Sequence, residues 1–292
     1  MEVNNRLFKG TIILTGILAL VSLAAMLQMR LDKPVFLDHY YDLRVHEDGN
    51  YRQEFRLTYI TNADDRRVVN QVEFPDYPNI RLNATEHGFM SHFPWDSSNQ
   101  QPPGEIHGRY SVRTVHCQID GLPIVEEMDG AVVKAARVFF NDGSQMDVPI
   151  GELHFYRFGL EDSPFESLSS SGSSDGSSSS RYRAREDVTL LSVKNQMLER
   201  FEHRLDLKIN DHVIDGIDGL EIEQDDHLVV RSKLYPGSDP LDVYTMVDIH
   251  PELYYKRADG QIGSMRFYNI DSLYHSFNFM DLYRYLKARE VV

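Results

Sequence analysis

The sequence contains a single cysteine, Cys117, among its 292 residues. One thiol cannot form a disulfide within the chain, whereas exported animal domains of this size usually carry several bridges. Since an apolar segment near the N-terminus indicates export, the shortage of cysteine favours a protein of the bacterial cell envelope. Cys117 shares a strand register with Val115 and Ile119, which predicts a small buried side chain and not a reactive thiol.

Signatures of bound cofactors and metals are also missing. The sequence has no G-x-G-x-x-G or G-x4-G-K phosphate loop, no H-E-x-x-H motif and no His-x-His pair among its 12 histidines. Residues 210–223 are acidic, but an EF-hand loop starting at Asp211 would place Val213 and Ile222 at ligand positions, and neither side chain carries an oxygen. No G-x-S-x-G nucleophile elbow is expected, and the serine-rich run 167–180 is predicted to be too flexible to hold a nucleophile. We therefore predict no catalytic residue, no metal ligand and no cofactor, and we lean toward a protein that is not an enzyme.

Basic residues are few relative to acidic ones. The chain has 45 Asp and Glu against 30 Lys and Arg, a formal net charge of −15. Contacts to phosphate groups need a basic surface, so this balance argues against nucleic acid as a partner. It also argues against close adhesion of the folded part to an anionic lipid surface.

What the sequence does have is an apolar stretch without any charge, Gly10–Met29. Twenty helical residues span about 30 Å, which matches the hydrocarbon core of a bilayer. We predict a short cytoplasmic tail over 1–9, one transmembrane anchor over 10–29 and a short stalk over 30–38. Pro34 lies in the stalk and prevents the helix from continuing.

A cleaved signal peptide is the alternative interpretation of the same stretch. Arg6 and Lys9 would then form its basic region, and Ser22-Leu23-Ala24 would supply the small-x-small residues just before the cleaved bond. The apolar run continues beyond Ala24 and is long for a signal peptide, which favours an uncleaved anchor. Cleavage would make the protein secreted.

The orientation of the anchor depends on basic residues, and these are balanced. Arg6 and Lys9 precede the stretch, and Arg30 and Lys33 follow it. The free amino terminus and the shortness of the tail favour an N-terminus inside the cell. The predicted location is therefore the cell membrane, with the C-terminal part outside the cytoplasm.

The rest of the chain alternates between apolar and polar residues. Tyr41, Leu43 and Val45 alternate with polar residues, and Asp48-Gly49 separates them from a second alternating run, which predicts a β hairpin. Asp-Gly pairs recur between further such runs, and two-residue turns connect antiparallel strands only. We predict a mainly β, antiparallel β-sandwich-like exterior with two peripheral helices, preceded by the N-terminal transmembrane helix. The predicted strands of the first half are 40–47, 53–61, 66–74, 79–85, 107–119, 131–141 and 146–157, a number and spacing that fit an immunoglobulin-like sandwich.

The serine-rich residues divide this exterior part. We predict a β-sandwich-like region over 39–166, a flexible loop or linker over 167–181, and an α+β region over 182–292 that packs with the first. Apolar spacing predicts helices over 192–205 and 279–289, the second with Asn278 as its N-cap. Strands are predicted at 205–209, 220–223, 227–234, 242–249, 252–257 and 262–268.

The long loop 94–105 and the residues just before it offer a possible partner-binding site. Trp95 is the only tryptophan, and His92 and Phe93 lie close to it in sequence. Exposed aromatic side chains on loops often contact partners, although such a tryptophan more often fixes its loop to the core.

These features favour a single-pass, membrane-anchored envelope protein that acts as a binding module. It would contact the membrane through residues 10–29 and bind another envelope protein or a wall polymer. The alternative is an envelope hydrolase that acts on wall glycans through a pair of carboxylates.

Overall fold

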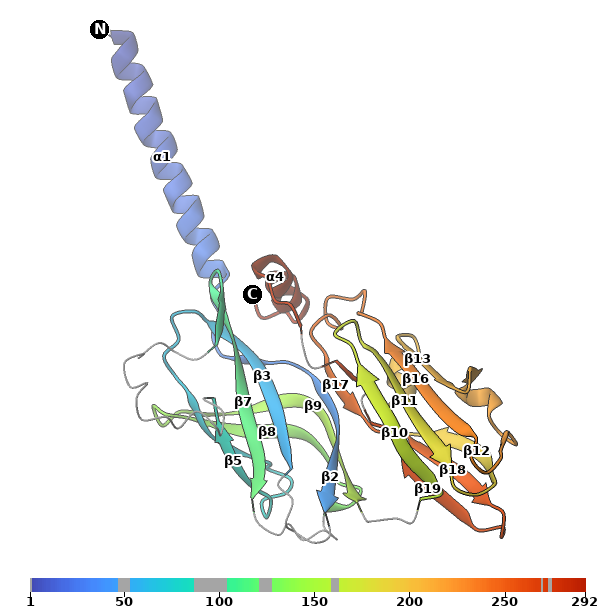
Figure 1. Cartoon of the computed structure of the whole chain (residues 1–292). Coiled ribbons are helices and arrows are strands. Elements are labelled where there is room, and N and C mark those ends of the chain that lie inside the picture. Colours follow the sequence, from blue (N-terminus) through green and yellow to red (C-terminus); the bar gives the residue numbers. More distant parts are fainter. Residues whose placement is uncertain are drawn as a thin grey trace, which may run out of the picture.

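The computed structural model describes residues 2–46, 53–86, 104–120, 128–158, 163–268, 270–272 and 275–292. Within these residues the chain is mainly β and forms four sheets with several antiparallel pairings, which confirms the predicted mainly β class. Two sandwiches lie side by side, and an N-terminal helix projects from the first (Figure 1). The sandwiches have separate cores of buried apolar side chains.

The first sandwich is built mainly from the N-terminal half of the chain. One of its sheets has the strand order β1-β3-β7-β5, with β6 also paired to β7: β1 (Val35–Phe36), β3 (Glu54–Asn62), β7 (Tyr110–Asp120), β5 (Arg81–Thr85) and β6 (Glu105–His107). The facing sheet has the order β20-β17-β2-β9-β8-β4: β20 (Ile270–Ser272), β17 (Met246–Ile249), β2 (His39–His46), β9 (Gln145–Phe158), β8 (Val132–Phe140) and β4 (Val69–Glu73). The C-terminal helix α4 (Phe279–Ala288) packs on this core through Leu282 and Leu286.

The second sandwich is formed by strands between residues 165 and 266, after β9 and before β20 of the first sandwich. One sheet has the order β10-β11-β16-β13-β14: β10 (Phe165–Gly172), β11 (Ser177–Ala184), β16 (His227–Leu234), β13 (Leu205–Ile209) and β14 (His212–Val213). The other has the order β15-β12-β18-β19: β15 (Glu221–Ile222), β12 (Val188–Lys194), β18 (Glu252–Arg257) and β19 (Ile262–Arg266). Two short helices, α3 (Leu198–Phe201) and the 3-10 helix η1 (Ile214–Gly216), connect its strands.

The predicted strands of the first half are confirmed, because β2, β3, β4, β5, β7, β8 and β9 all overlap their predicted ranges. The final helix is confirmed together with its cap, since the Asn278 side chain accepts a hydrogen bond from the backbone N–H of Asp281. Pairing is not antiparallel throughout, however. β2 runs parallel to both β9 and β17. Long excursions of the chain separate these strands, and the argument from two-residue turns does not apply to them.

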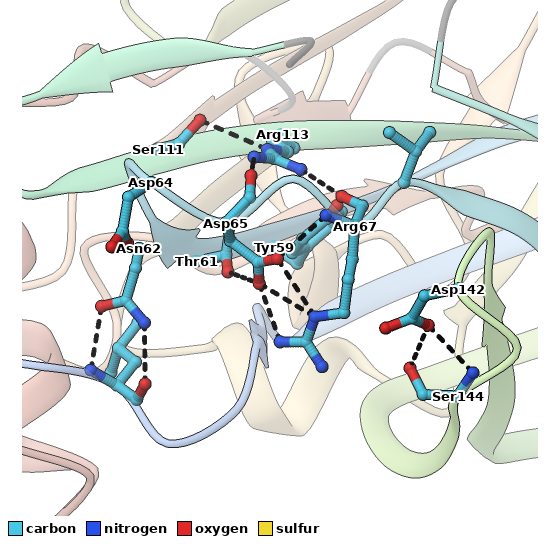
Figure 2. Close-up of polar contacts among 12 residues, drawn as sticks. Tyr59, Thr61, Asn62, Asp64, Asp65, Arg67, Ser111, Arg113, Asp142 and Ser144 are labelled. Atoms are coloured by element: carbon cyan, nitrogen blue, oxygen red, sulfur yellow. Dashed lines mark hydrogen bonds and ion pairs between the residues drawn. The ribbon is translucent and has the colours of Figure 1, made fainter.

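The predicted stalk over 30–38 is wrong, because this segment is part of the first sandwich. Leu31 and Leu37 are buried, and β1 pairs with β3. Asn62 holds Leu31 at both backbone groups: its Oδ1 accepts from the Leu31 N–H at 3.0 Å, and its Nδ2 donates to the Leu31 carbonyl at 2.7 Å (Figure 2). The Tyr110 hydroxyl donates to the Met29 carbonyl at 2.9 Å. Apolar side chains in a short connecting segment lower the free energy by joining the core, and this removes the freedom expected of a stalk.

Helix α1 (Glu2–Gln28) precedes this fastened segment and extends away from the sandwich (Figure 1). Its apolar side chains between Phe8 and Val21 are exposed. Within the residues that the structure describes, which for the side chains of α1 means 8–22 and Gln28, no helix is long and apolar enough to cross a membrane.

The predicted flexible loop or linker over 167–181 is also wrong, because this serine-rich run is part of a sheet. It forms the hairpin of β10 and β11, and β11 pairs along its length with β16. Asp175-Gly176 supplies the turn: Gly176 has a φ of +78°, and an added Cβ would lie 2.3 Å from the Leu234 carbonyl oxygen. Serine has only a weak preference for β-strands. In this register, however, serine hydroxyls hydrogen-bond across neighbouring strands, as those of Ser178 and Ser232 do at 2.7 Å.

The predicted helix over 192–205 is mostly wrong. β12 extends to Lys194, with Val193 opposite Leu253 of β18, and only Leu198–Phe201 is α-helical. The apolar spacing that indicated a helix is satisfied instead by a strand that ends at residue 194 and one short turn of helix. Pairing with a buried partner strand outweighed the local periodicity.

Candidate functional site

A cleft of about 850 Å³ opens between the two sandwiches. The first sandwich contributes Asp42 of β2 and residues 154–156 of β9. The second contributes the end of β12, α3, η1 and part of β18. Because its walls belong to different sandwiches, the cleft is shaped by the way in which these bodies meet.

The lining of the cleft is strongly acidic. Seven carboxylates face it, from Asp42, Asp129, Glu199, Glu202, Asp206, Asp215 and Glu252. Only two lysine or arginine side chains, Lys194 and Arg266, accompany them. The cleft therefore suits a ligand that carries positive charge.

Some of these carboxylates have structural partners. Asp42 joins the sandwiches, because its Oδ2 accepts from Asn195 Nδ2 and from the backbone N–H of His250, each at 2.6 Å. Asp129 accepts from the Arg157 backbone N–H at 2.9 Å. These two carboxylates therefore stabilise the fold through hydrogen bonds to Asn195, His250 and Arg157.

Three others are exposed and make no hydrogen bond or ion pair within the described part of the chain. They are Glu199 and Glu202, in and directly after α3, and Asp215 of η1. All three stand on the wall formed by the second sandwich. They are the side chains best placed to meet a bound cation, because binding one would not break an existing contact.

A chain of hydrogen bonds forms the junction beside the cleft. His250 Nε2 lies 3.1 Å from Asp248 Oδ1, and His250 Nδ1 lies 2.9 Å from the Tyr156 hydroxyl. Since a carboxylate only accepts, Nε2 carries the proton and Nδ1 accepts from Tyr156. The Arg266 guanidinium carbon lies 4.1 Å from the centre of the Tyr156 ring. Burial raises the pKa of Tyr156, which is 7% exposed, so its hydroxyl stays neutral. The hydroxyl therefore holds the His250 ring in place and is not a nucleophile.

A second polar cluster holds the turn between β3 and β4 in the first sandwich (Figure 2). Arg113 is 1% exposed, donates through Nη1 to the Arg67 carbonyl at 2.6 Å and through Nη2 to the Asp65 carbonyl. The Asp65 carboxylate accepts from Arg67 and from the Thr61 hydroxyl. Burial opposes ionisation of Asp65, but the hydrogen bonds from Arg67 outweigh it and lower the pKa of Asp65 to about 2. Each charged group here already has a partner, which marks the cluster as a clamp on the backbone and not as a ligand site.

Among the side chains discussed from the sequence, Cys117 is buried, as predicted, and burial raises the pKa of its thiol. The predicted partner-binding residues His92, Phe93 and Trp95 lie outside the described residues. In the part of the chain that the structure describes, no group of three or more His, Cys, Asp or Glu side chains is arranged to hold a metal ion.

The expectation that the chain has no G-x-S-x-G pattern is wrong. Gly172–Gly176 reads GSSDG and matches the G-x-S-x-G pattern of hydrolase nucleophiles. That pattern is functional where a strand turns sharply into a helix, whereas here it closes the hairpin of β10 and β11. Ser174 is therefore an exposed turn residue and not a candidate nucleophile.

The acidic wall of the cleft was also missed by sequence reasoning. The available signal is the density of Asp and Glu between residues 199 and 226, part of which resembles a calcium loop. No pattern could show that this stretch would face β9, which lies more than forty residues earlier in the chain.

No protein-family model and no curated protein sequence matches the chain. Among solved structures, the chain is similar to the D00-D0 domain of Intimin, with 10% sequence identity over 80% of this chain and 96% of that chain. The TM-score is 0.22. A score of this size does not establish a shared fold.

Proposed function

We propose that the protein is a single-pass, membrane-anchored module of the bacterial cell envelope, and that it binds a partner in the acidic cleft between its sandwiches. The partner would be another envelope protein, or a wall polymer, that presents protonated amines. The body would lie outside the cytoplasm.

The anchor part of this proposal is supported by the uncharged stretch Gly10–Met29 and by the exposure of the apolar side chains of α1. Exposed leucine and isoleucine side chains on all sides of a helix are costly in water and favourable in lipid. Protease treatment of intact cells tests the orientation. Digestion of the body in intact cells would support the proposal, and digestion only after lysis would reverse the orientation.

The binding part rests on one observation, which is the acidic cleft of about 850 Å³ with three unpartnered carboxylates on one wall. Opposite charges attract a partner over about a Debye length and then contribute to affinity where water is excluded. Glu199, Glu202 and Asp215 would supply that attraction.

Calorimetric titration of the full chain in detergent with a lysine-rich peptide tests this. The triple variant Glu199→Gln/Glu202→Gln/Asp215→Asn is expected to bind at least tenfold more weakly than the parent. The matched control is Asp76→Asn/Glu221→Gln/Glu223→Gln, which removes the same number of exposed carboxylates outside the cleft. An equal loss in both variants would mean that net charge, and not the cleft, attracts the peptide.

The same three carboxylates keep a second candidate open, an envelope hydrolase that uses a carboxylate pair on wall glycans. Glycoside hydrolysis needs one carboxyl group as an acid and a second as a nucleophile or base. Release of reducing sugars from a wall preparation by the full chain would support this function. Loss of that release in one of the three single variants, with full activity in Glu221→Gln, would locate the pair.

A further inference from the structure

A smaller cavity of about 340 Å³ adjoins the cleft. Tyr156, Glu252 and Arg266 line both cavities. Beyond these shared side chains, the smaller cavity is walled by Arg157 and Phe158 of β9 and by side chains from residues 163–182 and 264–268. We call it the tyrosine pocket, after Tyr156, Tyr182 and Tyr268.

Aromatic rings form the apolar side of the tyrosine pocket. Tyr156 and Tyr182 are buried, whereas Phe158 and Tyr268 are half-buried and face the space. Arginine side chains back two of the rings: the guanidinium carbon of Arg266 lies 4.1 Å from the Tyr156 ring centre, and that of Arg44 lies 5.1 Å from the Tyr268 ring centre. Rings fixed in this way from both sandwiches offer a rigid apolar surface at little entropic cost.

The polar side of the pocket is pre-arranged by the hairpin of β18 and β19. Glu252 stands opposite Arg266 in the strand register. Ser264 Oγ donates to Glu252 Oε1 at 2.7 Å, and Arg266 Nη2 donates to Glu252 Oε2 at 3.2 Å. Arg266 Nη1 also donates to the His250 carbonyl at 2.9 Å. A hydroxyl, a carboxylate and a guanidinium are therefore held side by side, with both donor and acceptor capacity directed along one wall.

This combination selects the chemistry of the ligand. A flat aromatic ligand would match the rings but would leave the Glu252–Arg266 wall desolvated without new hydrogen bonds. A lysine-rich segment would meet the positive charge of Arg266. A sugar ring has a face of C–H groups for the aromatic side and hydroxyl groups that both donate and accept for the polar side. The volume is at the small end of ligand pockets, about 300–1,000 Å³, which suits one ring of a chain and not a whole polymer.

We propose that the tyrosine pocket binds one hexopyranose ring of a glycan. This inference rests on the proposed function, because it makes a wall glycan the polymer that enters the cleft and gives its sugar a place at the junction of the sandwiches. The amine-bearing part of the ligand would meet the acidic wall, while the ring would meet Tyr268 and the Glu252–Arg266 wall.

The test is a calorimetric titration of the full chain in detergent with two soluble probes, tetra-N-acetylglucosamine and maltotetraose. At least one probe is expected to bind. Tyr268→Ala is expected to weaken that binding at least tenfold, Tyr268→Phe to keep it within threefold, and Ser264→Ala to weaken it severalfold. The control is Tyr235→Ala, since Tyr235 is an exposed tyrosine outside the pocket, and its affinity should equal that of the parent.

Failure of this inference can be distinguished from failure of the proposed function. The lysine-rich peptide should bind Tyr268→Ala as it binds the parent, and the sugar should bind the Glu199→Gln/Glu202→Gln/Asp215→Asn variant as it binds the parent. If neither probe binds the parent, or if sugar binding survives both Tyr268→Ala and Ser264→Ala, the pocket is not a sugar site. Thermal melting of each variant shows that a loss of binding does not reflect unfolding.

Discussion

The two sandwiches bury polar groups of different kinds. The first encloses ionisable side chains, including Arg113, Glu86 and His39, each of which is almost fully buried. In the β10-β11-β16 sheet of the second sandwich, the buried polar side chains of the described residues are the hydroxyls of Ser180 and Ser232. The second sandwich also buries the guanidinium of Arg204, just before β13, which donates to the Tyr235 and Asp242 carbonyls. A buried charge costs several kcal/mol unless it is paired, whereas a hydroxyl costs much less. The first sandwich therefore depends on the pairing of several buried ionisable groups, whereas the serine hydroxyls of the β10-β11-β16 sheet tolerate change.

His39 illustrates how the first sandwich manages this cost. The ring accepts from the Thr58 backbone N–H at 2.8 Å through Nε2, so Nδ1 carries the proton and donates to the Ile150 carbonyl at 3.2 Å. Burial lowers the pKa of His39 to about 3, which keeps it neutral. The ring joins the two sheets of the sandwich where the chain passes from β1 to β2.

The largest effect should come from removing the buried cation of the first sandwich. Arg113→Ala leaves the carbonyls of Asp65 and Arg67 without their donor and should lower the free energy of unfolding by about 2–4 kcal/mol. Urea denaturation of the full chain measures it. The matched control is Arg231→Ala in the second sandwich, because Arg231 is exposed and, among the described residues, its ion pair is with Asp211; it should change stability by about 0.5 kcal/mol or less. Equal losses of unfolding free energy in the two variants would show that the buried arginine is no more important than the exposed one.

The second largest effect should be a loss of stability in acid, through Asp65 in the clamp of the first sandwich. The pKa of Asp65 is lowered to about 2 from a usual value near 3.8, so its ionised form stabilises the fold above pH 4, and this contribution is lost as the pH falls from about 4 to 2. Asp65→Asn should therefore cost about 2 kcal/mol at pH 7 and nearly nothing at pH 2. Unfolding curves across this range should converge at the acid end, and parallel curves would contradict the assignment.

A smaller effect is expected where the first sandwich fastens the end of α1. Asn62→Ala removes both hydrogen bonds to the Leu31 backbone and should lower stability by about 1–2 kcal/mol. Hydrogen exchange at residues 30–38 should become faster, while exchange in the second sandwich stays the same. Unchanged exchange at Leu31 would show that burial of its side chain alone holds the segment.

The smallest effect should have the opposite sign and lies where β20 pairs with β17. Asp248 and Asp271 stand directly opposite each other. Burial, and then the charge of Asp248, raise the pKa of Asp271. A raised pKa means that stability is lost as the pH rises from the ordinary value through the raised one, so the ionised pair is unfavourable at neutral pH. Asp271→Asn should raise the melting temperature slightly at pH 7 and leave it unchanged at pH 3.

Sequence patterns predicted most strands of both sandwiches, since β13, β16 and β18 of the second have the predicted bounds 205–209, 227–234 and 252–257. In the first, strict alternation and Asp-Gly turns fix strand positions, because one face of each strand is buried. In the second, the helix expected over 192–205 gave way to β12, and the serine run became a hairpin. Both errors have one cause: the local signal was weak, and pairing with a distant strand, β18 or β16, decided the outcome.

The sequence by itself determined the mainly β class, most strands of both sandwiches, the capped helix α4, the buried Cys117 and the absence of charge in Gly10–Met29. All of these follow from periodicity or composition within one segment. Only the tertiary structure decided that residues 30–38 are packed, that two cores form, and that Glu199, Asp215 and Tyr156 line one cleft. Those features join segments far apart in the chain, and such contacts form because together they bury apolar surface and satisfy hydrogen bonds that no single segment can satisfy alone.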